Sequence, residues 1–346
     1  MKTARTTLGE LIAIMRGLPE STQDLLKTVF LGVAAALAAV AFLLLTNYVF
    51  RMTFLTFASR SLTYFLAGSF CVIMTTSLAV GLLLNRLSPD AAGSGIPQLK
   101  AAYWKEVGYV HLRPVVVKFI AGVLSLGGGT SLGREGPTVY IGGGLASVLS
   151  GYLGYPKRLR RGAMVIGASA GLAAAFNTPL AAITFVLEEI ITDINSRIIG
   201  RVVLSSVLGA FVVYAIVGRQ PAFILPSIEA VSWKVYAVYP LVAMVASLAG
   251  VVFHRFSLDF REQLKGLSAV PPWFLPCCGG FITWVIGAGC FILTGKVGIF
   301  GLGYHDLSEA LSHGLVWWVA GILLAGKLVA FIASYSFGGC GGIFSP

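Results

Sequence analysis

Charged side chains are scarce in this chain. Asp, Glu, Lys and Arg together make up 11% of its 346 residues, whereas hydrophobic residues make up 57%. Soluble domains usually contain about 25% charged residues, so a protein that faces water on all sides is excluded. The composition is typical of a polytopic membrane protein.

Acidic residues are fewer than basic residues: the chain has 14 Asp and Glu and 25 Lys and Arg, which gives a net charge of +11. A nucleic-acid partner is not indicated, because the basic residues are dispersed among apolar runs and form no basic face interleaved with aromatic residues. Basic residues before Thr28 and the cluster PKRLRR at Pro156–Arg161 favour a cytoplasmic position for both segments. We therefore expect a multi-pass protein of the cell membrane with a cytoplasmic N-terminus.

The chain also has few metal-binding or catalytic patterns. Its 5 cysteines form no CxxC pair, and its 4 histidines show no metal-ligand spacing beside acidic residues. The glycine-rich segments lack the Gly-Lys-Ser/Thr ending of a phosphate loop. No nucleophile–base pair stands out. We therefore predict no metal, no cofactor and no enzymatic activity, and we interpret the cysteines as small apolar packing residues.

Long uncharged runs are what the sequence has in abundance. A helix needs roughly 20 apolar residues to cross a bilayer. Most of the runs reach that length, whereas Phe119–Gly133 and Gly314–Gly326 are short. This mixture of long, short and Gly- or Pro-interrupted segments predicts tilted and discontinuous helices of the transporter kind. The long runs are Thr28–Phe50, Ser61–Asn85, Gly162–Leu187, Val202–Gly218, Val235–Phe253 and Gly266–Gly295.

One carboxylate lies inside an apolar, glycine-rich block. Glu135 stands next to Arg134 in GGGTSLGREGP, Gly127–Pro137, near a proline that suits a helix start. An ionisable group at membrane depth is costly and by default marks a pathway. Glycine-rich backbone is tolerated there only where protein or a water-filled cavity surrounds it. We predict an ion site at Glu135; the alternative is an ion pair with Arg134 at the membrane surface.

A hydroxyl group precedes a second predicted helix. Ser94 lies in GSGIP, Gly93–Pro97, just ahead of a helix that begins near Ile96. A helix start of this kind offers a hydroxyl and free backbone N–H groups, which bind an anion without lysine or arginine. Ser94 is therefore a candidate anion ligand. The alternative is that Ser94 only caps the helix.

Two neighbouring carboxylates end a short helix. The break at Thr178–Pro179 starts an apolar helix that ends in Glu188 and Glu189. At about 1.5 Å per residue this helix covers half a bilayer, so a carboxylate at its end would lie where a pore interior meets the cytoplasm. The alternative is that both glutamates are solvated residues at a membrane edge.

The sequence contains a weak internal repeat. GLGYHDLSEA at Gly301–Ala310 matches Gly93–Ala102 at an offset of 208 residues. Lys327–Pro346 matches Lys118–Pro137 without gaps at an offset of 209 residues. Two ordered blocks at nearly one offset predict duplicated halves, with a site at the repeat interface near the bilayer midplane.

The repeat sets the expected domains. These are an N-terminal cytoplasmic or interfacial segment 1–27, a first transmembrane repeat 28–218, and a second repeat 219–346. The first half continues for about 80 residues beyond Pro137, and this portion has no counterpart after Pro346. We therefore expect the second repeat to be incomplete.

Three motifs carry a family resemblance. GSGIP at Gly93–Pro97, GREGP at Gly133–Pro137 and GGIFSP at Gly341–Pro346 resemble the signature loops of the CLC family of chloride channels and chloride/proton antiporters. The segment AGLAAAFNTPLA at Ala170–Ala181 fits as well, and the resemblance runs from about Thr28 to the last residue. It implies an all-α polytopic membrane fold of inverted halves, here with a truncated second repeat, and a homodimer with one pore per subunit.

The resemblance also implies roles for individual residues. Ser94 would supply its hydroxyl to a central anion, and Ile343 and Phe344 would supply backbone N–H groups. Glu135 would be the gating glutamate. Glu189 matches the internal proton-transfer glutamate of the antiporter branch. The late helices of the family, with a tyrosine that completes the anion site, have no counterpart in this sequence.

We therefore expect exchange of chloride, or another small monovalent anion, for protons across the bilayer. Ionised Glu135 would compete for the anion site, and protonated Glu135 would swing away, which couples the two movements. One alternative is a passive chloride channel of the same fold, gated by voltage or protons. Another is a nonconducting fragment or assembly partner.

Overall fold

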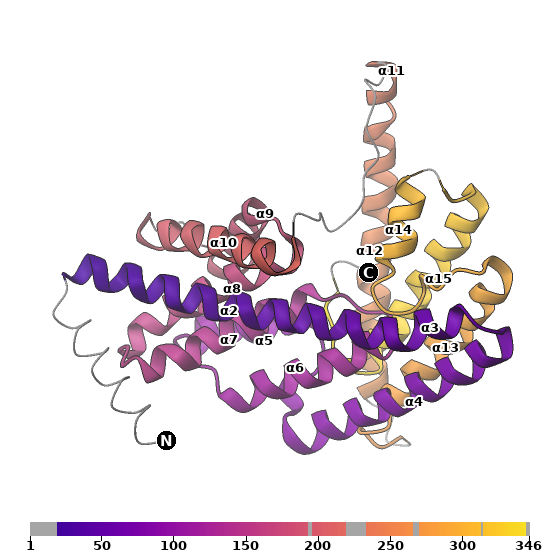
Figure 1. The fold of residues 1–346 in the computed structure, drawn as a ribbon, viewed down its shortest axis with the longest axis horizontal. Helices are drawn as coiled ribbons and strands as arrows, with labels where there is room; N and C mark the ends of the chain where they lie inside the picture. Colours follow the sequence, from indigo (N-terminus) through magenta and orange to yellow (C-terminus); the bar gives the residue numbers. More distant parts are fainter. Residues whose placement is uncertain (1–18, 193–195, 219–232, 266–269, 313, 344–346) are drawn as a thin grey trace. The chain divides into compact units, whose positions relative to one another are not determined.

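A computed structural model describes residues 19–192, 196–218, 233–265, 270–312 and 314–343. The regular elements of these residues are helices, and no strand occurs among them (Figure 1). The all-α class predicted from the sequence is confirmed. The α-helices are α2 (Glu20–Phe50), α3 (Thr56–Ala58), α4 (Leu62–Leu87), α5 (Ile96–Lys105), α6 (Leu112–Gly127), α7 (Glu135–Tyr152), α8 (Arg160–Phe176), α9 (Pro179–Phe185), α10 (Ser196–Val217), α11 (Trp233–Tyr236), α12 (Tyr239–Lys265), α13 (Leu275–Thr294), α14 (Tyr304–Leu311) and α15 (Trp317–Ser336).

Tighter and wider helical turns extend or link these helices. The π-helical turns are η1 (Arg51–Leu55) and η4 (Val186–Ile191), and the 3₁₀ turns are η2 (Pro89–Ala91) and η3 (Lys157–Leu159). The break predicted before Pro179 is confirmed: α8 ends at Phe176, the following residue Asn177 has a left-handed φ of 54°, and α9 begins at the proline. Helix α9 runs directly into η4, which carries Glu188 and Glu189.

Six helical segments among the described residues are long and apolar enough to cross a membrane. They are Glu20–Ala58, Leu62–Leu87, Ile198–Val217, Tyr239–Leu264, Leu275–Thr294 and Trp317–Ser336. The last one corrects the expectation of a short segment at Gly314–Gly326. Helix α15 has 20 residues because it continues past Lys327, whose ammonium group donates hydrogen bonds to carbonyl groups of a neighbouring loop.

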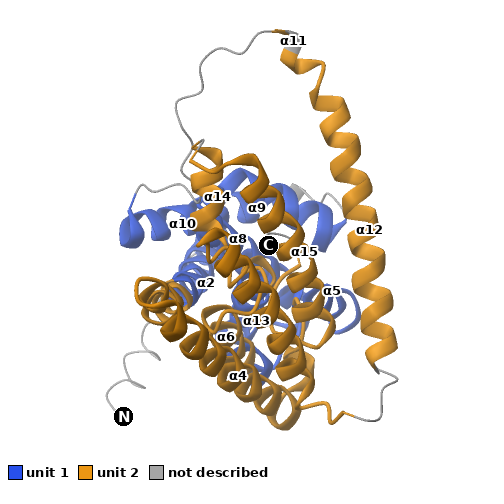
Figure 2. Cartoon of the chain, turned by 90° about the vertical axis from the view of Figure 1, so that its right-hand side faces the viewer, with its two compact units in different colours: residues 1–43, 95–116, 137–220 blue, residues 44–94, 117–136, 221–346 orange. Residues whose placement is uncertain are grey.

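The described chain forms two compact units, coloured separately in Figure 2. Unit 1 comprises Met1–Leu43, Gly95–Val116 and Pro137–Gln220. In it α8 packs against α9 and α10. Helices α7 and α8 approach closely, since a Cβ atom on Gly167 would lie 2.2 Å from the carbonyl oxygen of Gly142. The small residues Gly167 and Gly171, four positions apart in α8, allow this close helix packing.

Unit 2 comprises Leu44–Ser94, Val117–Gly136 and Pro221–Pro346. Helix α13 packs against α4 and α15, and α12 packs against α15. A cluster of aromatic rings fills part of its core, with the rings of Phe54 and Phe300 4.8 Å apart and those of Phe65 and Phe291 3.8 Å apart. Such pairs add about 0.5–1.5 kcal/mol each beyond their buried area, so this end of the unit is firmly packed.

The two units interleave along the sequence and therefore do not coincide with the repeats. The boundaries 28–218 and 219–346 stay a prediction. Most of the N-terminal segment 1–27 lies outside the described residues, and α2 begins at Glu20.

Candidate anion site

The three motif loops meet in unit 2. The N–H of Gly133 donates a hydrogen bond to the carbonyl of Gly342 at 2.9 Å, and the N–H of Gly342 donates to the carbonyl of Gly133 at 2.6 Å. This pair forms an isolated antiparallel bridge. The N–H of Gly93 donates to the carbonyl of Gly339 at 3.2 Å. Backbone hydrogen bonds therefore join GSGIP and GREGP to the segment that contains GGIFSP.

The Glu135 carboxylate lies against that bridge. Helix α7 begins at Glu135, and the residue is 1% exposed. A Cβ atom on Gly133 would lie 2.3 Å from Oε2 of Glu135, and one on Gly342 would lie 2.5 Å from Oε1. Glycine at both positions leaves room for the carboxylate in this place. The free N–H groups and dipole of a helix start favour a negative charge at this place.

Ser94 is buried beside the same loop and has a free hydroxyl. It is 2% exposed, and its Oγ has no hydrogen-bond partner among the described residues. The cap position of α5 is occupied by Gly95 with a left-handed φ of 99°, and no side chain caps this helix. The capping alternative is therefore wrong. An unpaired buried hydroxyl costs about 1–3 kcal/mol, so this group is suited to a ligand.

Backbone contact brings Ser94 next to the glutamate loop. A Cβ atom on Gly136 would lie 2.4 Å from both the carbonyl oxygen and Oγ of Ser94. Gly136 directly follows Glu135 in α7. The structure therefore unites the candidate anion ligand and the candidate gate, which the sequence separates by 41 positions.

The other candidate anion ligands come directly after Gly342 in the sequence. Ile343 is half-buried and comes directly after Gly342. Phe344 lies outside the described residues, so the structure does not place its N–H group.

Glu189 lies in unit 1 and is open to solvent. Its Oε1 is 3.3 Å from the ammonium of Lys100, and the two side chains are 48% and 39% exposed. The indole of Trp104 donates to the carbonyl of the next residue, Ile190, at 3.1 Å. An exposed ion pair contributes little to stability. Glu188 is also exposed, so the structure leaves the solvated alternative open for both glutamates.

A buried lysine holds the Ser94 loop, and the sequence analysis missed it. Lys118 is 0% exposed and donates hydrogen bonds to the carbonyls of Ala91 at 2.9 Å and Gly93 at 2.5 Å. The signal was present, because this lysine opens the aligned block Lys118–Pro137. A lysine in an apolar helix shows its role only when the partner carbonyl groups are known.

The same arrangement recurs in the second repeat segment. Lys327 donates hydrogen bonds to the carbonyls of Gly301 at 2.6 Å and Gly298 at 3.1 Å. Gly301 and Gly303 have φ values of 58° and 73°, and Gly93 and Gly95 have 71° and 99°. Each of these glycines adopts a conformation that other residues rarely take. The matching geometry at matching offsets supports duplication of this segment.

Arg134 lies against the residue that follows the loop Gly301–Gly303 of the second repeat segment. Its guanidinium lies 4.8 Å from the centre of the Tyr304 ring, and Arg134 is 5% exposed. Tyr304 is the first residue of α14. A cation over an aromatic face is stabilised, more strongly so when desolvated. The interaction fixes the residue before Glu135 to the second repeat segment.

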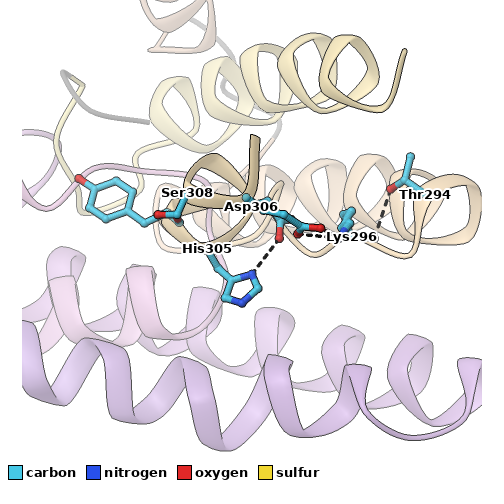
Figure 3. A network of polar contacts seen from close by, with 7 residues as sticks. Thr294, Lys296, His305, Asp306 and Ser308 are labelled. Carbon is cyan, nitrogen blue, oxygen red and sulfur yellow. Dashed lines mark hydrogen bonds and ion pairs between the residues drawn. The ribbon is translucent and has the colours of Figure 1, made fainter. Parts of the chain in front are cut away.

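Beyond Tyr304, α14 carries an acidic cluster that the sequence analysis did not single out. The ligand atoms of His305, Asp306 and Glu309 lie within 4.8 Å of one another, and His305 points toward Asp306 in Figure 3. The ammonium of Lys296 lies 2.6 Å from both carboxylate oxygens of Glu309. The protein thus supplies its own cation to this cluster. The absence of a metal site stays a prediction.

Comparison with known proteins identifies the family. The family described as voltage gated chloride channel matches residues 76–346. The chain is a CLC protein. Proteins of this family carry anions across membranes, so the chain is an anion transport protein of the membrane, and an enzymatic activity is not indicated.

Solved structures show that this CLC protein has the CLC transporter fold. A slow cyanobacterial Cl⁻/H⁺ antiporter is 21% identical, with a TM-score of 0.79 over 93% of this chain and 75% of that one. A CLC-type fluoride/proton antiporter is 19% identical, with a TM-score of 0.75 over 92% and 76%. A eukaryotic CLC transporter is 19% identical, with a TM-score of 0.65 over 90% and 65%. The CLC fold predicted from the three motifs is confirmed.

Proposed function

We propose that this CLC protein exchanges chloride, or another small monovalent anion, for protons, with Ser94 as anion ligand and Glu135 as gate. The observation that carries the proposal is the buried, unpartnered hydroxyl of Ser94 in contact with the backbone of Gly136, next to the Glu135 carboxylate. The donors at this place are a hydroxyl group and the backbone of a helix start. We assign the backbone N–H groups of Ile343 and Phe344 to the same anion.

Ligands that carry only partial charges suit transport. A full positive charge in a dry interior holds an anion tightly and slows its release. Hydroxyl and backbone N–H dipoles replace the hydration shell well enough for entry, yet permit exit. The Lys118 ammonium near the Ser94 loop acts differently, because the carbonyls of Ala91 and Gly93 accept its hydrogen bonds.

Glu135 can act as a tethered competitor of the anion. Ionised, its carboxylate occupies the space between Gly133 and Gly342 and repels an approaching anion. Protonated, it loses its attraction to the helix start and can leave that space. An anion enters when the proton arrives and leaves when the proton departs. This alternation couples chloride movement to proton movement.

We assign proton transfer on the cytoplasmic side to Glu189. Its exposure to solvent supports exchange of protons with water, and the Lys100 ammonium keeps its carboxylate paired. The cytoplasmic position of the N-terminus belongs to the same proposal and rests on the basic cluster Pro156–Arg161.

We also propose a homodimer. Helix α10 presents large apolar side chains at helical spacing on one exposed face, Val203, Val207, Phe211 and Tyr214. A second copy of the chain would cover this face. Single-molecule subunit counting in liposomes tests the proposal, and a distribution dominated by monomers at low protein density would overturn it.

Proton flux in liposomes tests the function. Purified protein is reconstituted with a chloride gradient, and uphill proton movement is followed together with chloride efflux. We expect the unsubstituted chain to move both ions. Glu135→Gln should keep chloride flux and abolish proton movement, because an amide cannot carry the proton. Uphill proton movement that persists in Glu135→Gln would contradict the gate.

Glu189 is tested with its neighbour as the matched control. Glu189→Gln should abolish proton coupling, whereas Glu188→Gln should leave it unchanged, since both residues are exposed and only Glu189 has the assigned role. Equal effects of the two variants would contradict the assignment.

The flux assay also separates the alternatives. A passive chloride channel of the same fold is favoured by one observation, the surface ion pair of Glu189, which fits a merely solvated carboxylate. Chloride flux without uphill proton movement in the unsubstituted chain would select the channel. No chloride flux at all would select a nonconducting assembly partner.

A further inference from the structure

Four basic residues lie close together where α7 is joined to α8 in unit 1. Lys157 and Arg158 belong to η3, and Arg160 and Arg161 form the first turn of α8. The first two are exposed, and the two arginines of α8 are half-buried. None of the four forms an ion pair with a carboxylate among the described residues. We call these four residues the basic loop.

Both arginines of α8 are stacked on tyrosine rings. The guanidinium of Arg160 lies 5.2 Å from the centre of the Tyr109 ring, and that of Arg161 lies 5.6 Å from the centre of the Tyr103 ring. Arg161 also donates a hydrogen bond to the carbonyl of Trp104 at 3.1 Å. Stacking holds the face of a guanidinium and leaves N–H groups on its edge for bonds to a phosphate. The two side chains are therefore positioned before a ligand binds.

The loop between α5 and α6 packs against the start of α8. A Cβ atom on Gly108 would lie 2.5 Å from the backbone nitrogen of Arg161. Ser147 of α7 donates a hydrogen bond to the carbonyl of Gly108 at 2.6 Å, which ties this loop to a third helix. The loop carries one carboxylate, Glu106, which is exposed and forms no ion pair with the described residues. Side chains of the described chain therefore leave the positive charge of the basic loop unpaired.

The basic loop lies near the end of a membrane-crossing helix. Lys27 directly precedes the uncharged run Thr28–Phe50 of α2. Its ammonium lies 5.1 Å from the centre of the Tyr155 ring, and Tyr155 is two residues before Lys157. Aromatic side chains of this kind are enriched at membrane–water interfaces. The exposed ones in this region are Trp104, Tyr109 and Tyr152. These contacts place the basic loop at the level of the lipid headgroups.

We propose that the basic loop is a binding site for an anionic phospholipid, whose phosphate group is bound by Arg160 and Arg161. Four positive charges at headgroup level attract a lipid with a net negative charge. A zwitterionic lipid brings its own ammonium group, which the same charges repel. Leu159 lies between the two pairs of basic residues and is exposed, so it offers an apolar contact to the lipid. This site is separate from the ion exchange proposed above and does not depend on it.

Native mass spectrometry of the purified chain measures lipid binding. We expect phosphatidylglycerol to bind at least about tenfold more tightly than phosphatidylcholine, since each basic residue near an anionic headgroup is worth about fivefold in affinity. In Arg160→Gln/Arg161→Gln this preference should fall to about threefold or less. The corresponding double lysine variant keeps the charge but loses the planar donors, so its preference should lie between the two. Equal binding of the two lipids to the unsubstituted chain would overturn the proposal.

Two controls distinguish a built site from diffuse attraction. Lys157→Gln/Arg158→Gln removes the same charge from the unstacked residues and should weaken binding less than the Arg160/Arg161 change. Arg60→Gln should leave the preference unchanged, because Arg60 is stacked 5.1 Å from the centre of the Tyr64 ring but lies outside the basic loop. An equal loss in both double variants would show diffuse attraction and contradict the site. Displacement of phosphatidylglycerol by millimolar inorganic phosphate would assign the site to free phosphate and contradict the lipid.

Hydrogen exchange locates the lipid without a variant. The unsubstituted chain is placed in nanodiscs of phosphatidylcholine, with or without phosphatidylglycerol, and amide exchange is followed by mass spectrometry. We expect phosphatidylglycerol to slow exchange at 106–111 and 156–161, because a bound headgroup covers both loops. Exchange at Ser59–Ser61, around the control arginine, should not change. Identical exchange of the two loops in both lipids, or slowing at another place only, would overturn the proposal.

Discussion

Two loops of unit 2 share one backbone plan but differ in chemistry. In each loop, two glycines with positive φ flank a single residue, and a lysine from a later helix holds the carbonyl of the first glycine. The residue between the glycines is Ser94 in the first loop and Leu302 in the second. The glycines and the lysine therefore build the loop, whereas the hydroxyl group makes one of the two loops a candidate anion ligand.

The loops also differ in their surrounding charge. The second loop is followed by the buried carboxylate of Asp306, which attracts the Lys327 ammonium. The first loop has a second cation, Arg261, where the other has an acid. The charge of Lys327 beside Leu302 is therefore offset by a nearby carboxylate, whereas the neighbour of Lys118 is another positive charge, Arg261. We therefore expect an anion to bind at the first loop rather than at the second.

The largest expected effect comes from removing the first lysine. Lys118→Met leaves the carbonyls of Ala91 and Gly93 unpaired in the protein interior, which costs about 3 kcal/mol of unfolding free energy. We expect a clear fall in the thermal unfolding midpoint in detergent, together with loss of chloride flux, because the Ser94 hydroxyl is no longer held in place.

Lys327→Met is the matched comparison. It should lower the unfolding midpoint to a similar degree, since Lys327 also holds buried carbonyl groups, but folded protein should keep its affinity for chloride. If both variants lost chloride affinity equally, the division between a ligand loop and a scaffold loop would be wrong.

A smaller effect is expected from removing the hydroxyl itself. Ser94 Oγ is buried and makes no hydrogen bond to described residues, so Ser94→Ala should not lower the unfolding free energy and should raise it by about 1 kcal/mol. Chloride affinity should fall about tenfold, which corresponds to the loss of one hydrogen bond to a charged group. Isothermal titration of chloride into the purified protein measures this change.

Ser77→Ala is the control for Ser94→Ala. Ser77 is 1% exposed, and its hydroxyl likewise has no partner among the described residues, but it lies within α4, outside the motif loops. Its removal should leave chloride affinity unchanged. A loss of affinity in both variants would indicate a general effect on the fold.

The sequence predicted those residues of this site that are unusual for their place in a membrane protein. Glu135 was found because a carboxylate is rare in an apolar block, and Ser94 because it precedes a helix start with two glycines. No local pattern specifies which loops meet, so only the family resemblance indicated that Glu135 and Ser94 share a site, and the contact of Gly136 with Ser94 and the bridge between Gly133 and Gly342 came from the structure.

The residues that were missed are basic. Lys118, Lys327 and Arg261 lie within helices, where a basic residue in the sequence indicates a helix end or a membrane surface. Because the uncharged run ends before Lys327, the segment was expected to be short, whereas α15 has 20 residues. The charge is tolerated because carbonyl groups from a loop accept its hydrogen bonds, and those carbonyls belong to residues at least 26 positions away.

The smallest effect should come from placing a hydroxyl in the second loop. Leu302→Ser reproduces the Gly-Ser-Gly sequence of the first loop, but the Asp306 carboxylate repels an anion there, so we expect no additional bromide peak in anomalous diffraction. Adding Asp306→Asn removes that negative charge while the Lys327 hydrogen bonds to Gly298 and Gly301 remain, and a weak peak should then appear. Bromide binding in the single variant would mean that the hydroxyl alone makes the site and that the surrounding charge contributes nothing.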